Sequence, residues 1–157
     1  TEGEKDSFCF AALPPDPRVT YYEPLVMENE LVRVQFNESD LSVSSYYDKR
    51  TGCDLLSKEG AHFVLHRERT LKGGSAWVEG VHKTPLNLNR QADVTLKEIN
   101  LHTPLRQSLC YEIKYGKSKL EVTAQLSDDS AVLEFSVKCD WMETASPDDV
   151  PVLSFAL

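Results

Sequence analysis

Residues 105–139 alternate apolar and polar side chains over three consecutive segments, and this pattern constrains the fold more than any other feature of the sequence. A period of two is typical of a β-strand with one buried and one solvated face. The apolar positions are Leu105, Leu109, Tyr111, Ile113 and Tyr115, then Leu120, Val122, Ala124 and Leu126, then Leu133, Phe135, Val137 and Cys139. Because no helical set of apolar residues is sustained, the pattern predicts three long antiparallel strands.

Turn residues separate the three segments. Gly116-Lys117 lies where the apolar parity changes from odd to even, and glycine tolerates the positive φ of a tight hairpin turn. Asp128-Asp129-Ser130 marks a second reversal, since short polar side chains bond their own backbone. The alternation then ends at Asp140-Trp141-Met142-Glu143.

Shorter strands are expected in the rest of the chain. They are residues 31–36, 41–47, 53–56, 61–66, 92–102 and 152–157. Residues 82–90, which include Pro85, Asn87 and Asn89, are expected to form a loop, and no helix of more than two turns is predicted. The spacing of strands and turns predicts an all-β protein, an antiparallel β-sandwich.

The first 24 residues contain four prolines, which disfavour regular structure, and we expect a Pro-rich linker there. One β-sandwich domain is then expected over residues 25–157, and a chain of this size can bury a core without a disulfide or a metal. The chain begins at Thr1 and ends on the apolar segment Val152–Leu157, so we expect it to be a fragment of a longer protein.

Composition argues against two classes of partner. The net charge of −8 comes from 25 acidic and 17 basic residues, which disfavours binding to nucleic acid or to an anionic membrane. No apolar run approaches the ~18 residues of a membrane helix, and the first residues are polar rather than signal-like. The cysteines, Cys9, Cys53, Cys110 and Cys139, form no Cys-x-x-Cys pair, and we expect them to be reduced in a cytoplasmic protein, with a disulfide as the alternative that the sequence leaves open. Cys139, on an apolar strand face, is expected to be a structural thiol.

Few residues group in a way that supports catalysis. His62 and His66, if they belong to a strand, lie ~13 Å apart, whereas two nitrogen ligands of one zinc lie within ~4 Å of each other. No metal site is therefore predicted. Nucleophile motifs and phosphate-binding glycine loops are missing, so no catalytic residue is assigned to this chain.

Paired carboxylates are the catalytic groups of most glycosidases. The pairs in this chain are Asp128 with Asp129, Asp140 with Glu143, and Asp148 with Asp149. The first and third lie in predicted turns, where acidic residues serve turn geometry. Asp140 and Glu143 flank Trp141, and aromatic rings of this type stack on sugars. Together with Trp77 they are our candidates for substrate-side or interface residues, with packing in the core or between domains as the alternative for both tryptophans.

Several pieces of the sequence, in order, resemble the C-terminal β-sandwich region of glycoside hydrolase family 38 α-mannosidases. The pieces are Met27–Phe36 (E-N-E-apolar-x-R-V-x-F, an opening strand), Leu41–Gly52 (I-x-S-I-Y-D-K-x-T-G, a hairpin), Ser75–Trp77 (x-A-W), Leu133–Glu143 (L-x-F-x-x-x-V-D-W-x-E) and Val152–Phe155 (L-x-F). The resemblance covers about residues 25–157 and implies a galactose-mutarotase-like supersandwich.

For the parent protein, the resemblance implies zinc-dependent, retaining hydrolysis of terminal α-mannosides. Family members carry the zinc and a nucleophilic aspartate in an N-terminal α/β domain introduced by a His-x-His-x-Asp motif, and nothing in this chain corresponds to it. Our leading hypothesis is a non-catalytic domain of a cytoplasmic α-mannosidase. Its expected partners are the catalytic domain of the same chain and mannose-containing glycans.

Two alternatives belong to other functional classes. One is a free-standing carbohydrate-binding module that uses Trp77 and Trp141, and the other is a structural scaffold without a sugar role. In the leading hypothesis the fragment alone is inactive and holds no cofactor, because zinc belongs to the missing catalytic domain. The sequence leaves self-association open.

Overall fold

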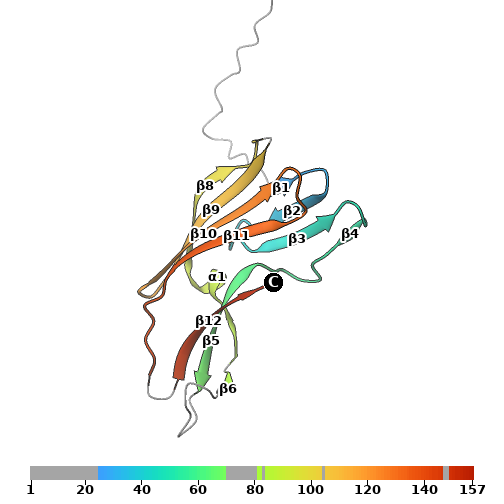
Figure 1. Cartoon of the computed structure of the whole chain (residues 1–157). Coiled ribbons are helices and arrows are strands. Elements are labelled where there is room, and N and C mark those ends of the chain that lie inside the picture. The colour runs from blue at the N-terminus through green and yellow to red at the C-terminus, as the bar shows by residue number, and fades with distance from the viewer. Residues whose placement is uncertain (1–24, 70–80, 83, 104, 147–148) are drawn as a thin grey trace, which may run out of the picture.

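A computed structural model describes residues 25–69, 81–82, 84–103, 105–146 and 149–157. Within these residues the chain forms twelve β-strands and one four-residue helix, which confirms the predicted all-β class. All strand pairs are antiparallel, and they form three sheets (Figure 1). The expected linker, residues 1–24, and Trp77 lie outside the described residues.

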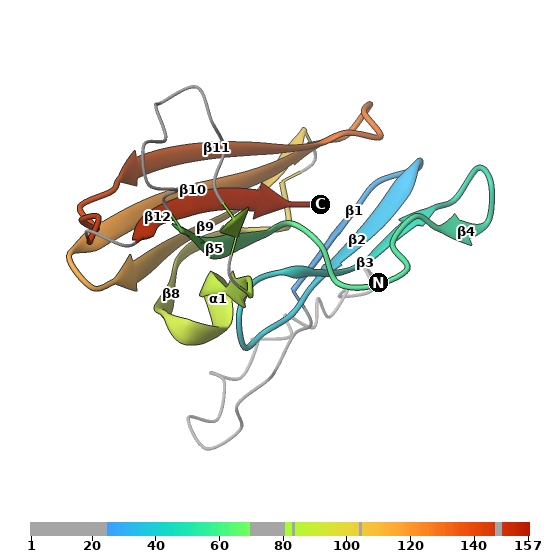
Figure 2. The ribbon, with the colours of Figure 1, turned by 90° about the horizontal axis from the view of Figure 1, so that it is seen from below.

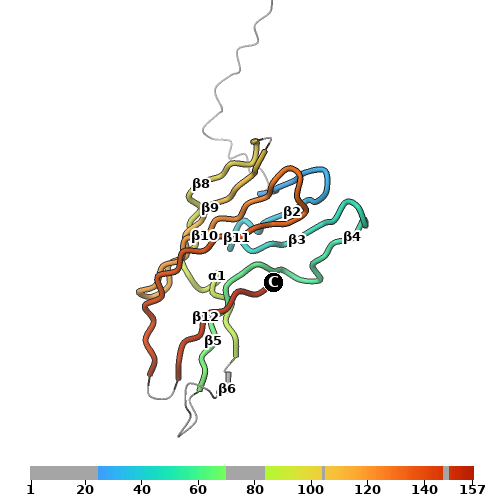
Figure 3. Tube along the Cα trace, in the orientation of Figure 1, coloured from blue at the N-terminus to red at the C-terminus, as the bar shows by residue number. Residues whose placement is uncertain are grey.

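The longest strands form one sheet in the order β11-β10-β9-β8. They are β8 (Asp93–Asn100), β9 (Arg106–Tyr115), β10 (Ser118–Ser127) and β11 (Leu133–Asp140). Gly116 has a φ of 56° in the turn between β9 and β10, which confirms the predicted hairpin. Ile113 pairs with Leu120 and Leu109 with Ala124, so the change of parity keeps the apolar side chains of both strands on one face, here called the inner face. Figure 3 shows β11 beside β10, at the edge of this sheet.

Two smaller sheets complete the sandwich. The first, in the order β1-β2-β3-β4, contains β1 (Val26–Glu28), β2 (Val32–Phe36), β3 (Val43–Asp48) and β4 (Cys53–Asp54). The second has the order β12-β5-β6 with β7 also paired to β5, and it contains β5 (His62–Arg69), β6 (Val81–His82), β7 (Leu86–Asn87) and β12 (Asp149–Ala156). Figure 2 shows β5 and β12 as a layer in front of the β8–β11 sheet. The rings of Phe155 in β12 and Phe135 in β11 lie 5.2 Å apart, so the two layers are in contact.

One hydrophobic core joins the three sheets and the helix α1 (Leu88–Gln91). Its most deeply buried members are Met27, Val32, Val34, Val43, Leu65, Leu88, Leu109, Tyr111, Ile113, Leu120, Val122 and Leu126. Burial of one such side chain stabilises a fold by roughly 1.5–3 kcal/mol. The alternating positions of β9 and β10 therefore supply the centre of the core, as the sequence pattern predicts.

The inner face is covered incompletely at both edges of the β8–β11 sheet. Leu96 and Ile99 in β8 pair with core residues of β9, yet they are 37% and 47% exposed. Val137 in β11 pairs with buried Val122 and is 40% exposed. Cys139 is also exposed, so the expectation of a buried structural thiol there is wrong. The physical reason is that every residue of β11 from Ser136 to Asp140 is exposed, so this half of the strand lies outside the cover of the smaller sheets.

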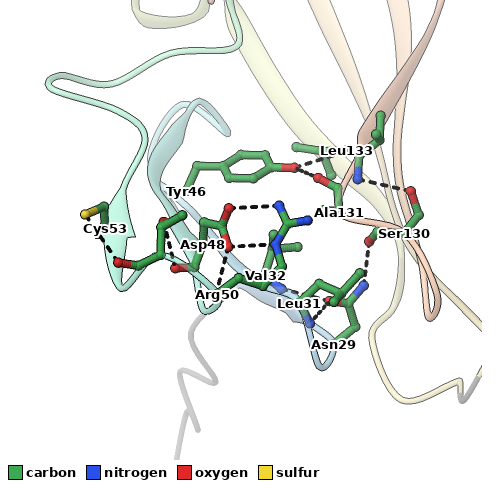
Figure 4. Close-up of polar contacts among 12 residues, drawn as sticks. Asn29, Leu31, Val32, Tyr46, Asp48, Arg50, Cys53, Ser130, Ala131 and Leu133 are labelled. Carbon is green, nitrogen blue, oxygen red and sulfur yellow. Dashed lines mark hydrogen bonds and ion pairs between the residues drawn. The ribbon is translucent and has the colours of Figure 1, made fainter.

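Side-chain hydrogen bonds to backbone hold the β1–β4 sheet against the turn between β10 and β11 (Figure 4). The Asn29 amide nitrogen donates to the carbonyl oxygens of Ser127 and Ser130, both at 2.7 Å. The Tyr46 hydroxyl donates to the Ala131 carbonyl oxygen at 2.5 Å and accepts from the Leu133 backbone N–H at 3.2 Å. These two side chains hold together segments that lie 85–101 residues apart in sequence.

The strand expected over residues 31–36 is confirmed as β2, and polar side chains explain two local features beside the expected strands. A turn separates β2 from the short strand β1, because Asn29 Oδ1 accepts from the backbone N–H groups of Leu31 and Val32. The expectation of a loop over residues 82–90 is wrong, because this segment contains β7 and most of α1. Asn87 Oδ1 accepts from the Arg90 backbone N–H at 3.3 Å and caps the helix.

Substitution Asn29→Ala is expected to lower the free energy of unfolding by about 2–3 kcal/mol, because it leaves two carbonyls and two backbone N–H groups without their partner. Chemical denaturation of the isolated chain measures this loss. The matched control is Asn100→Ala in the exposed strand β8, for which we expect a change within about 0.5 kcal/mol. Equal effects of the two substitutions would contradict this role of Asn29.

Candidate functional site

The segment Asp140-Trp141-Met142-Glu143 leaves the end of β11 and passes the turn between β9 and β10. Trp141 is half-buried and packs against the hydrophobic core. Asp140 is exposed, and its backbone pairs with that of Lys119 in β10. Trp77, the fourth candidate from the sequence, lies outside the described residues. The described candidates thus lie together at one end of the β8–β11 sheet.

Glu143 is held by the β9–β10 turn. Its Oε1 atom accepts from the backbone N–H of Lys117 and from the hydroxyl of Ser118, each at 3.0 Å. The Ser118 hydroxyl oxygen in turn accepts from the Met142 backbone N–H at 2.9 Å. A Cβ atom at position 116 would lie 2.5 Å from Glu143 Oε1, so glycine serves both the positive φ and the close approach of this carboxylate.

These contacts fix the chemistry that Glu143 can perform. A carboxylate oxygen that accepts two hydrogen bonds from its own domain is oriented by that domain and has lost part of its capacity for a ligand. The contact fastens the segment after β11 to a turn about 25 residues earlier in sequence. Asp140 is more accessible, since it borders an open hollow lined by Lys119, Glu121, Lys138 and Cys139.

Asp48 forms a second polar site, at the hairpin between β3 and β4 (Figure 4). Its Oδ1 atom accepts from the Arg50 backbone N–H at 2.8 Å, and its two oxygens accept from the Arg50 guanidinium at 3.0 and 2.8 Å. The side-chain and backbone bonds from Arg50 lower the pKa of Asp48 to about 2. Gly52 follows with a φ of 71°. The Asp48 side chain therefore sets this turn by accepting from the backbone two residues further along the chain.

Two motif segments meet beside this hairpin. The Lys49 ammonium donates to the Asn29 carbonyl oxygen at 2.6 Å and forms an ion pair with Glu28 at 2.7 Å. Arg33 lies 3.5 Å from the same Glu28 carboxylate. The polar residues of the segments Met27–Phe36 and Leu41–Gly52 therefore bond to each other, and within the described part of the chain they do not line a common cavity.

A third polar cluster joins α1 to the loop before β3. Arg90 donates to Asp40 Oδ2 at 2.9 Å and also pairs with Glu59, and Asn89 donates to the Asp40 carbonyl oxygen at 2.8 Å. Burial alone would raise the pKa of Asp40, but hydrogen bonds from Ser42 and Arg90 outweigh it and lower the pKa. The cluster satisfies a buried carboxylate and positions the helix.

Glu112 forms a charged cluster on the outer face of the β8–β11 sheet. Its side chain is only 8% exposed and lies 2.9–3.2 Å from the ammonium groups of Lys97, Lys114 and Lys119. Lys119 also pairs with Glu121 at 2.8 Å. Hydrogen bonds from Lys119, then from Lys114 and Lys97, lower the pKa of Glu112 to about 2. The three lysines neutralise a carboxylate that the sheet buries.

The other titratable candidates fall into separate structural roles. His62 and His66 both belong to β5, so the strand expected over residues 61–66 is confirmed. Asp128 and Asp129 lie in the turn after β10, as predicted. Asp149, expected in a turn, begins β12 and forms an ion pair with Arg67 at 3.1 Å. Asp148, its neighbour in sequence, lies outside the described residues.

Two findings concern ligands and membranes. Among the described residues, no group of three or more His, Cys, Asp or Glu side chains is placed to hold a metal ion. The described part of the chain also has no helix with the length and apolar content to span a membrane.

Sequence reasoning missed three residues that organise these sites. Asn29, Tyr46 and Asn89 each bond backbone groups on distant elements. Asn89 Oδ1, for example, accepts from the Phe63 backbone N–H at 2.9 Å. The only sequence feature that marks these residues is a polar side chain within an apolar or turn segment. That feature does not identify the distant backbone group with which the side chain bonds.

A double-mutant cycle tests the contact between Glu143 and the β9–β10 turn. We expect Glu143→Ala and Ser118→Ala each to lower the free energy of unfolding by about 1–2 kcal/mol, with a coupling energy of about 1 kcal/mol because they share one hydrogen bond. Thermal and chemical denaturation measure these values. Glu98→Ala, at an exposed position of β8, is the control, and additive effects at positions 118 and 143 would refute the contact.

The lowered pKa of Glu112 predicts a dependence of stability on pH. A carboxyl group with a pKa of about 2 in the folded protein and 4.5 ordinarily stabilises the fold fully above pH 4.5. That stabilisation is lost as the pH falls from about 4.5 to about 2. Glu112→Gln should therefore flatten the loss of stability over this range, as measured by denaturation at several pH values. An unchanged slope would contradict the assignment.

Comparison with known proteins assigns the family. No curated protein sequence matches this chain. Residues 27–147, well over half of the chain, match the family described as glycosyl hydrolases family 38 C-terminal domain. The matched region begins in β1, includes all of the β8–β11 sheet, and ends beyond Glu143. The chain therefore belongs to the glycosyl hydrolase family 38 C-terminal domains.

Proposed function

We propose that this chain is a non-catalytic β-sandwich domain of a zinc-dependent, retaining α-mannosidase that hydrolyses terminal α-mannosides. The observation that carries the proposal is the bonding of the motif residues within the domain. Asp48 bonds Arg50, Asn29 bonds the β10–β11 turn, and Glu143 bonds the β9–β10 turn. Side chains held in this way stabilise a domain rather than act as a catalytic pair, which needs carboxylates facing one sugar.

Zinc and the nucleophile would belong to a catalytic domain of the same polypeptide. The described residues do not fit a zinc site, because no group of three His, Cys, Asp or Glu side chains is placed to hold one ion. No step of the hydrolysis is assigned to this chain. Among its candidates, exposed Asp140 is the group most available to contact the catalytic domain or a glycan. A cytoplasmic parent is compatible with the free thiols of Cys53, Cys110 and Cys139.

The β8 edge is the surface that we assign to the catalytic domain. Leu96 and Ile99 are exposed on its inner face, and Leu105, which precedes β9 and lies near the end of β8 at Asn100, is 80% exposed. Apolar side chains gathered on one side of a domain mark interaction sites. The start of the described chain lies at the same end of the sheet, since the Glu28 backbone exchanges hydrogen bonds of 2.9 and 2.5 Å with the Gln107 side chain in β9. A domain that precedes this one in sequence is thus well placed to cover β8.

The first test uses the isolated chain. We expect no hydrolysis of an aryl α-mannoside and no binding of methyl α-mannoside or mannobiose in calorimetry, because the chain packs its motif residues internally. The polypeptide that includes the catalytic domain should hydrolyse the same aryl mannoside. Saturable binding of mannosides by the isolated chain would instead favour a carbohydrate-binding module.

A second measurement addresses packing on the catalytic domain. Ile99→Asp places a charge on the exposed inner face of β8 and should cost the longer polypeptide at least about 1 kcal/mol of interdomain packing. The isolated chain should lose much less stability. Asn100→Asp puts the same charge on the opposite face of the same strand and is the control. Equal losses from Ile99→Asp with and without the catalytic domain would argue against this surface.

A further inference from the structure

We propose that the edge of β11 pairs antiparallel with the β11 edge of a second copy of this chain, so that two four-stranded sheets become one continuous sheet. Within the described residues β11 pairs with β10 alone, and its second edge has no strand partner. The backbone N–H and C=O groups along such an edge are a template for another strand. This inference does not depend on the proposed function.

The other edges of the three sheets are protected, whereas β11 is not. Strand β8 has an irregular register between Leu96 and Glu98, β12 contains Pro151, and β1, β4 and β6 have only two or three residues each. Bulges, prolines and short lengths are the features that prevent pairing between edges. Strand β11 has eight residues, no proline, and an unbroken register with β10. It is the long, regular edge in the described part of the chain.

Charge complementarity identifies a second copy as the occupant. Glu134 and Lys138 are exposed on the outer face of β11, two positions on either side of Ser136. If two β11 strands pair antiparallel about Ser136, Glu134 of one copy lies opposite Lys138 of the other, and symmetry repeats the pair. Opposite charges directly across two strands are favourable. Each β11 strand therefore carries both the acidic and the basic residue that the pairing needs.

The same charges disfavour the neighbouring registers. Pairing about Val137 would place Glu134 opposite Asp140, which is repulsive, and pairing about Phe135 would leave Glu134 and Lys138 opposite uncharged residues. Moving one strand by a single residue along the other would place inner-face residues opposite outer-face residues. Among these three registers, only the one centred on Ser136 places Glu134 and Lys138 opposite each other, and it leaves Asp140 opposite uncharged Val132.

The inner face supports the same register. About Ser136, Phe135 lies opposite Val137 of the second copy, and Leu133 lies opposite Cys139. Val137 and Cys139 are the exposed members of this face, so the pairing would cover apolar atoms that one copy leaves in water. Phe135 is already fixed by its contact with Phe155 and presents a rigid neighbour.

A charge-swap series tests the proposal by sedimentation velocity of the full chain over a concentration series. We expect the chain to dimerise, and Glu134→Lys or Lys138→Glu alone to raise the dimer dissociation constant by roughly tenfold or more, since each replaces two attractive pairs by repulsive ones. The double variant Glu134→Lys with Lys138→Glu should restore dimerisation. Glu98→Lys makes the same charge change on β8 and should leave the dissociation constant unchanged.

Each alternative outcome overturns the proposal. A chain that stays monomeric up to its solubility limit has no such interface. Dimers that are insensitive to both single variants use another surface, and a double variant that stays monomeric excludes the register about Ser136. Circular dichroism and the melting temperature of each variant verify that the compared chains are folded.

Discussion

Burial of the inner face of the β8–β11 sheet is the interaction on which the rest of the structure depends. Its two central strands supply seven of the buried apolar side chains of the core, and the other sheets are placed so as to exclude water from them. The covering sheets are narrower than the surface they cover. The inner faces of the two central strands are therefore dry, whereas the edge strands β8 and β11 keep apolar side chains partly in water. The interfaces assigned to this domain follow from that mismatch.

A sandwich with small covering layers needs more than apolar contact to fix their position, because apolar attraction has little directional preference. Hydrogen bonds from Asn29, Tyr46 and Asn89 to backbone groups have the required direction and fix the position of the covering layers. Each buried carbonyl or N–H group left without such a partner would cost about 1–3 kcal/mol. The polar residues of the family-like motifs are therefore explained by positioning of the layers, and they require no ligand to account for their presence.

The sequence predicts those parts of the fold that local patterns encode. The alternation in β9 and β10 and the glycine turn at Gly116 depend on neighbours in sequence, and they form as expected. Distant contacts were not predictable, since nothing near Glu143 indicates that its partner is the turn beside Gly116. The exposure of Cys139 was missed for a related reason. Alternation identifies which face a residue occupies, but the extent of the covering layer decides whether that face is buried.

The two exposed edges also differ in a way that separates their roles. On β8 the irregular register disrupts the line of backbone groups, so a partner there would recognise mainly the apolar side chains of Leu96 and Ile99. On β11 the backbone line is regular and the charges are self-complementary, which suits another strand. A neighbouring domain of the same chain needs only the first kind of surface, because it is held at high effective concentration. A separate copy lacks that advantage, and the specific backbone and charge pairing of β11 would compensate for it.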